Sequence, residues 1–147
     1  METESLKGKV IWFYGLSGAG KTTTANEFIE ANRKSIGEIV VLDGDTFRED
    51  WCSDLGFSIS DRYTNIVRAC AVAKEVSDRG ITVIASFTTP FRMMREHLRN
   101  ILGDKLILTF VDTPLEVCME RDPKGLYKRA LAGEIKNMIG IDIPFEV

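Results

Sequence analysis

The segment from Gly15 to Thr22 carries glycines, a lysine and a threonine at the spacing that binds nucleotide phosphates. It fits the pattern G-x-x-x-x-G-K-[ST] at every fixed position. Glycines let successive backbone N–H groups turn toward one anion, and the positive end of a following helix points at the same place. In such a loop Lys21 neutralises the β- and γ-phosphates, and the Thr22 hydroxyl ligates Mg²⁺.

The segment therefore predicts a site for a nucleoside triphosphate. The residues predicted to contact its phosphates are Gly15, Leu16, Ser17, Gly18, Ala19, Gly20, Lys21, Thr22, Thr23 and, from a later segment, Arg121.

Two carboxylates, Asp43 and Asp45, directly follow an apolar run that ends at Leu42. At the end of a strand, one of them could hold the water shell of the metal and the other could accept a proton from an attacking hydroxyl. The alternative for Asp45 is to cap the next helix, because Asp is a favoured cap residue. Asp112 also follows an apolar run, but its place before a capping-box pattern favours a capping role over metal binding.

Basic side chains are the next chemical signal, because the planar fork of arginine suits phosphate and sulfate. Taken singly, each of these arginines fits a solvated helix face, but together they indicate an anionic acceptor. A polar break at residues 121–125 predicts a mobile lid that brings Lys124 over the transferring phosphate, and its alternative is a plain exposed loop. The arginines that fall beyond strand ends or near helix starts are Arg48, Arg62, Arg68, Arg92 and Arg95.

The elements that must position these residues alternate along the chain. Apolar runs predict strands at residues 9–14, 38–42, 81–85 and 105–111, and helical spacing predicts helices at 21–34, 60–79 and 91–101. A further helix is predicted to begin at Thr113, because Thr113, Pro114 and Glu116 have the spacing of a capping box. Strands that alternate with helices predict an α/β fold with a parallel sheet, with ligands at the carboxyl ends of its strands.

Length and composition limit the remaining possibilities. The 147 residues predict a single domain over 1–147, with 44% hydrophobic and 28% charged residues as in an ordinary globular protein. A net charge of -3 argues against nucleic acid or an anionic membrane as partner, and no apolar run has the length of a membrane span. An acidic start without a leader pattern and three scattered cysteines predict a cytoplasmic protein.

Several longer motifs resemble the adenylyl-sulfate kinase (APS kinase) family, over about residues 9–145. Besides the phosphate loop they are Leu42-Asp-Gly-Asp-Thr-Phe-Arg48, Ile84-Ala-Ser-Phe-Thr-Thr-Pro-Phe-Arg92 and Arg121-Asp-Pro-Lys-Gly-Leu-Tyr-Lys128. The resemblance implies a P-loop fold of three α/β/α layers, with ATP and Mg²⁺ as cofactors. It also implies that the enzyme phosphorylates the 3′-hydroxyl of adenosine 5′-phosphosulfate, giving 3′-phosphoadenosine 5′-phosphosulfate and ADP. The resemblance favours a homodimer.

The resemblance further implies roles for individual residues. Thr22 and Asp43 hold the metal, Asp45 faces the 3′-hydroxyl, and Phe57 and Phe145 bracket the adenine. The implied catalytic residues are Lys21, Asp43, Asp45, Thr89 and Lys124. The lid is implied to span about residues 121–140, with Lys124 as its cation. The implied acceptor contacts are Asp45, Arg48, Phe57, Arg62, Asn65, Phe87, Thr88, Thr89, Lys124 and Phe145.

The chain departs from the family pattern in several places. Thr89 stands where the family has a serine linked with a phosphorylated enzyme form, and Met138 with Ile139 stands where Phe-Thr is usual beside the adenine. Val67 and Cys52 replace polar residues, which leaves open a kinase of the same fold with another nucleotide-activated acceptor. The fifth strand usual in the family is expected to lie outside this sequence. A GTPase-type switch is disfavoured because no Asn-Lys-x-Asp motif is present, and a non-catalytic partner domain is the remaining alternative.

Overall fold

Four parallel strands form one sheet in the computed structural model, which describes residues 5–147. The strand order is β2-β3-β1-β4, so the strand before the phosphate loop is central. The elements are β1 (Val10–Tyr14), α1 (Lys21–Ala31), α2 (Arg33–Ile36), β2 (Ile39–Asp43), α3 (Gly44–Trp51), α4 (Ile59–Asp78), β3 (Thr82–Ser86), α5 (Arg92–Leu102), the 3₁₀ turn η1 (Gly103–Lys105), β4 (Leu106–Phe110), α6 (Leu115–Arg121) and α7 (Leu126–Leu131).

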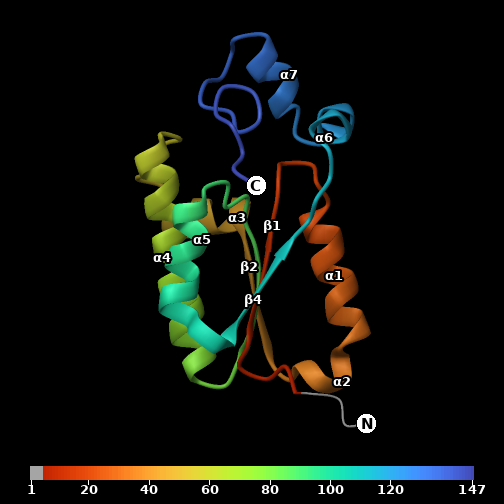
Figure 1. The fold of residues 1–147 in the computed structure, drawn as a ribbon, viewed down its shortest axis with the longest axis vertical. Coiled ribbons are helices and arrows are strands. Elements are labelled where there is room, and N and C mark those ends of the chain that lie inside the picture. Colours follow the sequence, from red (N-terminus) through yellow and green to blue (C-terminus); the bar gives the residue numbers. More distant parts are fainter. Residues whose placement is uncertain (1–4) are drawn as a thin grey trace.

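Helices cover both faces of the sheet, as the near-continuous apolar strands predict (Figure 1). Val10 and Trp12 of β1 pack on the side of α4 and α5, whereas Ile11 and Phe13 pack on the side of α1. This alternation follows from the two-residue period of a strand. The predicted α/β fold with three layers and a parallel sheet is therefore confirmed.

The strand register brings the chemically important strand ends to one edge. Asp43 at the end of β2 lies beside Ser86 of β3, and Phe13 near the end of β1 lies on the other side of Ser86. Above this edge, α6, α7 and the last coil form the upper part of the molecule in Figure 1. They enclose a small core of their own, which consists of Ala19, Cys118, Tyr127, Ala130 and Met138.

Two local predictions need correction. The helix predicted at 21–34 divides at Asn32, whose side-chain amide donates a 2.8 Å hydrogen bond back to the Phe28 carbonyl. The capping box at Thr113 is wrong, because α6 begins at Leu115 without a side-chain cap. The Thr113 hydroxyl instead donates a 2.7 Å hydrogen bond to the Ala19 carbonyl of the phosphate loop.

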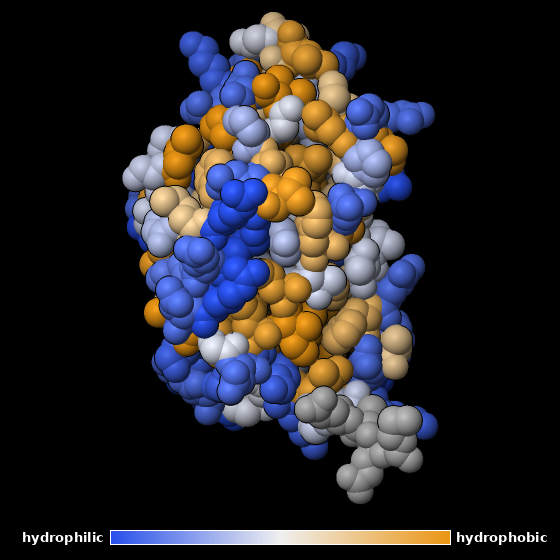
Figure 2. Space-filling model, in the orientation of Figure 1, coloured by the Kyte–Doolittle hydropathy of each residue, from blue (hydrophilic) through white to orange (hydrophobic). Residues whose placement is uncertain are grey.

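The strand β4 forms one edge of the sheet in the described part of the chain. Ile107, the second residue of this strand, is 37% exposed. Figure 2 shows a hydrophobic area in the centre of this face, bordered by strongly hydrophilic side chains.

None of the helices in residues 5–147 combines the length and the apolar character that a membrane crossing requires.

Candidate active site

The phosphate loop lies between β1 and α1, as predicted. Glycine is required at position 15 because a Cβ there would lie 2.7 Å from the Val111 carbonyl oxygen. The Lys21 ammonium folds back over the loop and donates hydrogen bonds of 2.9 and 2.8 Å to the carbonyls of Gly15 and Leu16. Burial, and secondarily the charge of Lys124, lower the pKa of Lys21 from 10.5 to about 8. A buried cation of this kind favours an anion beside it, because the anion restores the lost charge stabilisation.

A cleft of about 720 Å³ opens beside the loop. Ser17 to Thr23 line it, together with Asp43, Asp45, Arg121 and Lys124. Gly15 and Leu16 contribute only through the carbonyls that Lys21 binds. The structure thus places eight of the ten predicted triphosphate contacts on this cleft, and Gly15 and Leu16 are the two that do not line it. Arg121 lies beside the loop, where it donates a 3.2 Å hydrogen bond to the Gly18 carbonyl.

Asp43 lies where a metal ligand is expected. One of its carboxylate oxygens accepts a 3.3 Å hydrogen bond from the Thr22 hydroxyl, and the other accepts from the Asp45 N–H at 3.0 Å. The second bond makes Asp43, and not Asp45, the cap of α3. Within residues 5–147 no three His, Cys, Asp or Glu side chains converge on one point. A hydroxyl and one carboxylate nevertheless suit Mg²⁺, which takes its other ligands from phosphates and water.

Asp45 and Lys124 form an ion pair at the boundary between two clefts. The second cleft has a volume of about 520 Å³ and shares Asp45, Lys124 and Thr88 with the first. A carboxylate at this junction can face both the end of a bound triphosphate and a hydroxyl in the second cleft. The capping role considered for Asp45 is thereby replaced by a position suited to accepting a proton.

Two arginines in the second cleft surround the exposed ring of Phe57. The guanidinium carbon of Arg48 lies 4.4 Å from the ring centroid, and that of Arg62 lies 5.4 Å away. Burial, with the charge of Arg48 as a second cause, lowers the pKa of Arg62 to about 10. Neither arginine has a carboxylate in salt-bridge range among the described residues. Two adjacent desolvated cations without a counter-ion form a site for a small multivalent anion.

Asn65 supplies an open hydrogen-bonding group in the same cleft. Asn65 is 6% exposed, and its side-chain carbonyl oxygen has no hydrogen-bond partner within the described part of the chain. Buried polar atoms are rarely left unpaired. The oxygen is therefore available to a ligand N–H or O–H donor, which supports the predicted contact of Asn65 with the acceptor.

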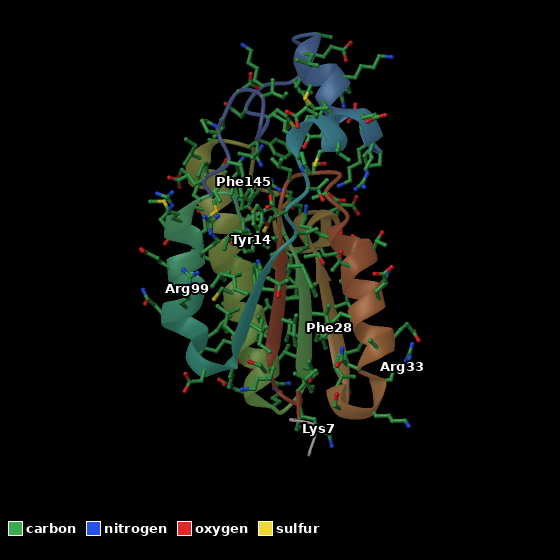
Figure 3. All side chains as sticks on the ribbon, turned by 45° about the vertical axis from the view of Figure 1, so that its right-hand side comes forward. Lys7, Tyr14, Phe28, Arg33, Arg99 and Phe145 are labelled. Atoms are coloured by element: carbon green, nitrogen blue, oxygen red, sulfur yellow. The ribbon has the colours of Figure 1, made fainter. Side chains whose placement is uncertain are left out.

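Phe145 does not bracket the cleft with Phe57. It stacks on Phe110 and Tyr14, with ring centroids at 5.6 and 6.3 Å, and it does not line the second cleft. Figure 3 shows Phe145 directly above Tyr14, near the carboxyl edge of the sheet. Met138 and Ile139 line the cleft with Phe57, so these side chains occupy the place predicted for Phe145.

Three of the five arginines predicted to bind an anion do not line the second cleft. Arg68 makes two hydrogen bonds to the Asp54 carboxylate, at 2.7 and 2.9 Å, and Arg92 binds the last residues of the chain. Arg95 is buried and donates to the backbone carbonyls of Thr89 and Glu146. Arg48 and Arg62 remain as candidate anion ligands because they are the two of the five that line this cleft. They also donate to backbone carbonyls, Arg48 to that of Gly56 and Arg62 to those of Phe57 and Asn137.

Thr89 is buried and has a structural role. Its hydroxyl accepts a 2.9 Å hydrogen bond from the Trp12 indole N–H and donates at 3.1 Å to the Phe87 carbonyl. With 1% of its surface exposed, this hydroxyl is not accessible to a phosphate donor. Thr89 borders the second cleft with Phe87 and Thr88, but the catalytic role predicted for it has no geometric support.

We expect Thr89→Val to destabilise the protein by about 1–3 kcal/mol, because it leaves the buried Trp12 N–H without an acceptor. Thr89→Ser keeps the hydroxyl and should stay close to the parent. Residue 89 has a φ of 46°, and both variants keep a non-glycine residue there, as in the parent. Urea denaturation of the three proteins measures the difference. Equal stability of the Val and Ser variants would contradict the structural role.

Sequence reasoning missed several residues around the two clefts. Arg129 and Lys136 line the second cleft from the predicted lid segment, and Tyr127 contacts the phosphate loop from the same segment. The sequence shows a basic stretch with one tyrosine after residues 121–125. It does not show which of these side chains face the clefts. The movement of this lid stays a prediction.

Comparison with known proteins identifies the family of this chain. The family model described as adenylylsulphate kinase matches residues 7–147. The chain is 50% identical over 146 residues to the adenylyl-sulfate kinase of Aeromonas salmonicida, covering 99% of this chain and 74% of that protein. It is 49% identical over 141 residues to the corresponding Enterobacter protein.

A solved structure of the Mycobacterium tuberculosis APS kinase in complex with AMPPNP and APS superposes with a TM-score of 0.89 at 41% identity, over 96% of this chain and 83% of that one. A Sinorhizobium meliloti gluconokinase, at 18% identity and a TM-score of 0.58, shares the fold alone. With a family model that matches nearly its whole length, the chain belongs to the adenylylsulphate kinase family.

Proposed function

We propose that this protein transfers the γ-phosphate of ATP to the 3′-hydroxyl of adenosine 5′-phosphosulfate, giving 3′-phosphoadenosine 5′-phosphosulfate and ADP. The observation that carries the proposal is the pair of clefts that meet at Asp45 and Lys124. One cleft has a phosphate loop, and the other has two arginines and an aromatic ring. Family membership supports the same donor and acceptor.

In the reaction, the 3′-oxygen forms a bond to the γ-phosphorus while the bond from that phosphorus to the β–γ bridging oxygen breaks. The hydroxyl proton passes to the Asp45 carboxylate, and ADP leaves. Such transfers have a loose transition state, so the protein contributes mainly by positioning the reactants and neutralising charge. Lys21 and the loop N–H groups stabilise the charge of the triphosphate. Lys124 neutralises the transferring phosphoryl group after the Lys124 ammonium has separated from Asp45.

Thr22 and Asp43 would hold Mg²⁺, because both line the first cleft and their oxygens lie 3.3 Å apart. When bound, the ion neutralises charge on the β- and γ-phosphates. The Asp43 carboxylate is fixed in this position by its second role as the cap of α3.

On the acceptor side, Arg48 and Arg62 bind the phosphosulfate, and the ring of Phe57 stacks on the adenine. Met138 and Ile139, which line the second cleft, take the place of Phe145 beside the adenine. The alternative of a different nucleotide-activated acceptor rested on Val67 and Cys52. Neither of these residues lines the second cleft, so that alternative loses its main support.

The test is release of ADP from Mg·ATP when adenosine 5′-phosphosulfate is added to the purified protein. AMP, GMP and other nucleotides serve as competing acceptors in the same assay. We expect ADP release with the phosphosulfate and little with the others. No release with the phosphosulfate would overturn the proposal, and faster release with another nucleotide would assign a different acceptor.

We expect Arg62→Met to raise the KM for adenosine 5′-phosphosulfate by about 10- to 100-fold, because it removes a charge-assisted contact. The KM for ATP should change less than about threefold, since Arg62 lies outside the first cleft. Arg99→Met is the matched control, because Arg99 is exposed on α5 and lines neither cleft (Figure 3). Initial-rate kinetics measure both constants, and a parallel rise in the two KM values would contradict the assignment.

The proposal also includes a cytoplasmic location and a homodimeric assembly. The three cysteines are buried free thiols, which supports a reducing cytoplasm. The homodimer stays a prediction, and a Thiobacillus denitrificans APS kinase of 27% identity is described as hexameric.

A further inference from the structure

The outer side of the phosphate loop is held by side chains. Five consecutive carbonyls, from Gly15 to Ala19, accept side-chain hydrogen bonds, the first two from Lys21. The Ser17 carbonyl accepts from the Tyr127 hydroxyl at 2.7 Å, and the Ala19 carbonyl accepts from the Thr113 hydroxyl at 2.7 Å. The Gly18 carbonyl between them accepts from Arg121 at 3.2 Å.

Each of these bonds also sets the direction of an N–H group. In a planar trans peptide the carbonyl of one residue and the N–H of the next point in opposite directions. Tyr127 therefore turns the Gly18 N–H away from itself, and Thr113 does the same for the Gly20 N–H. Neither N–H has a hydrogen-bond partner within residues 5–147, whereas the Ala19 N–H between them donates to Leu16 within the loop. The two hydroxyls thus fix two of the loop peptide groups whose N–H is open; the N–H groups of Leu16 and Ser17 also have no partner within residues 5–147.

Tyr127 is placed firmly enough for such a role. It is 1% exposed and packs with Ala19, Cys118 and Met138. The Asp122 carboxylate accepts the N–H groups of Tyr127 and Lys128, both at 3.0 Å, which fixes the first turn of α7. Burial raises the pKa of the Tyr127 hydroxyl above its ordinary value, so the proton that the bond to Ser17 requires stays on the oxygen.

We propose that Thr113 and Tyr127 are positioning residues for the nucleotide phosphates, whose hydroxyls orient the Gly18 and Gly20 N–H groups toward the bound triphosphate. Tyr127 has a second effect, because it is anchored three residues after Lys124. The same hydrogen bond ties the segment that carries Lys124 to the phosphate loop. The inference takes ATP as the nucleotide from the proposed function, but the orientation of the loop does not depend on the acceptor.

Isosteric variants test the two hydroxyls separately. Thr113→Val and Tyr127→Phe should each raise the KM for ATP by about 5- to 10-fold, the value of one hydrogen bond. The inhibition constant of inorganic tripolyphosphate against ATP should rise by the same factor, because it binds through phosphates alone. The KM for adenosine 5′-phosphosulfate should stay within about twofold. Thr64→Val and Tyr63→Phe on α4 are matched controls, since neither residue lines a cleft.

A structural role alone gives a different pattern. Unchanged ATP and tripolyphosphate constants would overturn the proposal, and so would a parallel rise in the KM of both substrates. Thr113→Ser keeps the hydroxyl and should behave as the parent, and an equal defect in the Ser and Val variants would also overturn it. If the parent protein does not phosphorylate adenosine 5′-phosphosulfate, the proposed function fails instead, and calorimetric titration with ATP still tests the loop.

The tie to Lys124 has its own readout. Tyr127→Phe should lower kcat in addition to its effect on ATP, whereas Thr113→Val should not, because Thr113 lies outside the lid segment. In a Lys124→Met background the kcat loss from Tyr127→Phe should disappear, since both changes act through one group. A full loss in that background would show that Tyr127 does not act through Lys124.

Discussion

Replacing Lys21 with Met should lower kcat/KM for ATP by about 10³-fold, the size expected when a transition-state cation is removed. Methionine keeps much of the length of the lysine side chain but has no charge and no donor. The Lys21 ammonium is the only charged side chain that binds the loop carbonyls of Gly15 and Leu16 in the described structure. The loss should appear mainly in kcat, because charge on the β–γ bridge grows as the bond breaks.

A matched control distinguishes this effect from a general loss of lysine charge. Lys34→Met removes the same charge from an exposed position on α2, away from both clefts, and should leave the rates unchanged. Single-turnover measurements with saturating ATP isolate the transfer step. If Lys21→Met keeps more than about a tenth of the parental rate, the lysine does not act on the transferred phosphate, and the role assigned to the loop is wrong.

The nucleotide side of the site could be predicted because its determinants are local. The loop residues are contiguous, and Asp43 and Asp45 lie at and just after the end of a strand, so any parallel sheet brings them to the edge that holds the loop. The acceptor side depends on contacts between distant segments. Arg48 and Arg62 reach the cleft, but an equally plausible Arg68 is paired with Asp54. Sequence spacing alone does not show which arginine forms an ion pair with a carboxylate in the folded protein.

Hydroxyl groups show the same limit more clearly. Thr113 has the sequence context of a helix cap, yet its hydroxyl binds Ala19, 94 residues away in the sequence. Thr89 occupies a position linked by resemblance with phosphorylation, yet the Trp12 indole and the Phe87 carbonyl use its hydroxyl. A hydroxyl can satisfy a local or a distant partner at similar free energy, so the tertiary packing makes the choice.

We expect Asp45→Asn to lower kcat by about 10²- to 10⁴-fold, because the amide cannot accept the proton of the attacking hydroxyl. Both KM values should change little, since the side chain stays nearly isosteric and Arg48 and Arg62 still hold the acceptor. Asp50→Asn on the same helix is the control, because Asp50 is exposed and lines neither cleft. Rapid-quench measurement of product formation gives the rate of the transfer step directly.

Comparison with Asp43→Asn separates the proton acceptor from the metal ligand. Asparagine caps a helix as well as aspartate does, so this change keeps α3 intact and weakens only the oxygen set beside Thr22. Raising the Mg²⁺ concentration should therefore restore much of the activity of Asp43→Asn. It should not restore Asp45→Asn, because that loss concerns a proton that the metal does not accept. Recovery of Asp45→Asn at high Mg²⁺ would reverse the two roles and would make Asp45 the carboxylate that holds the ion.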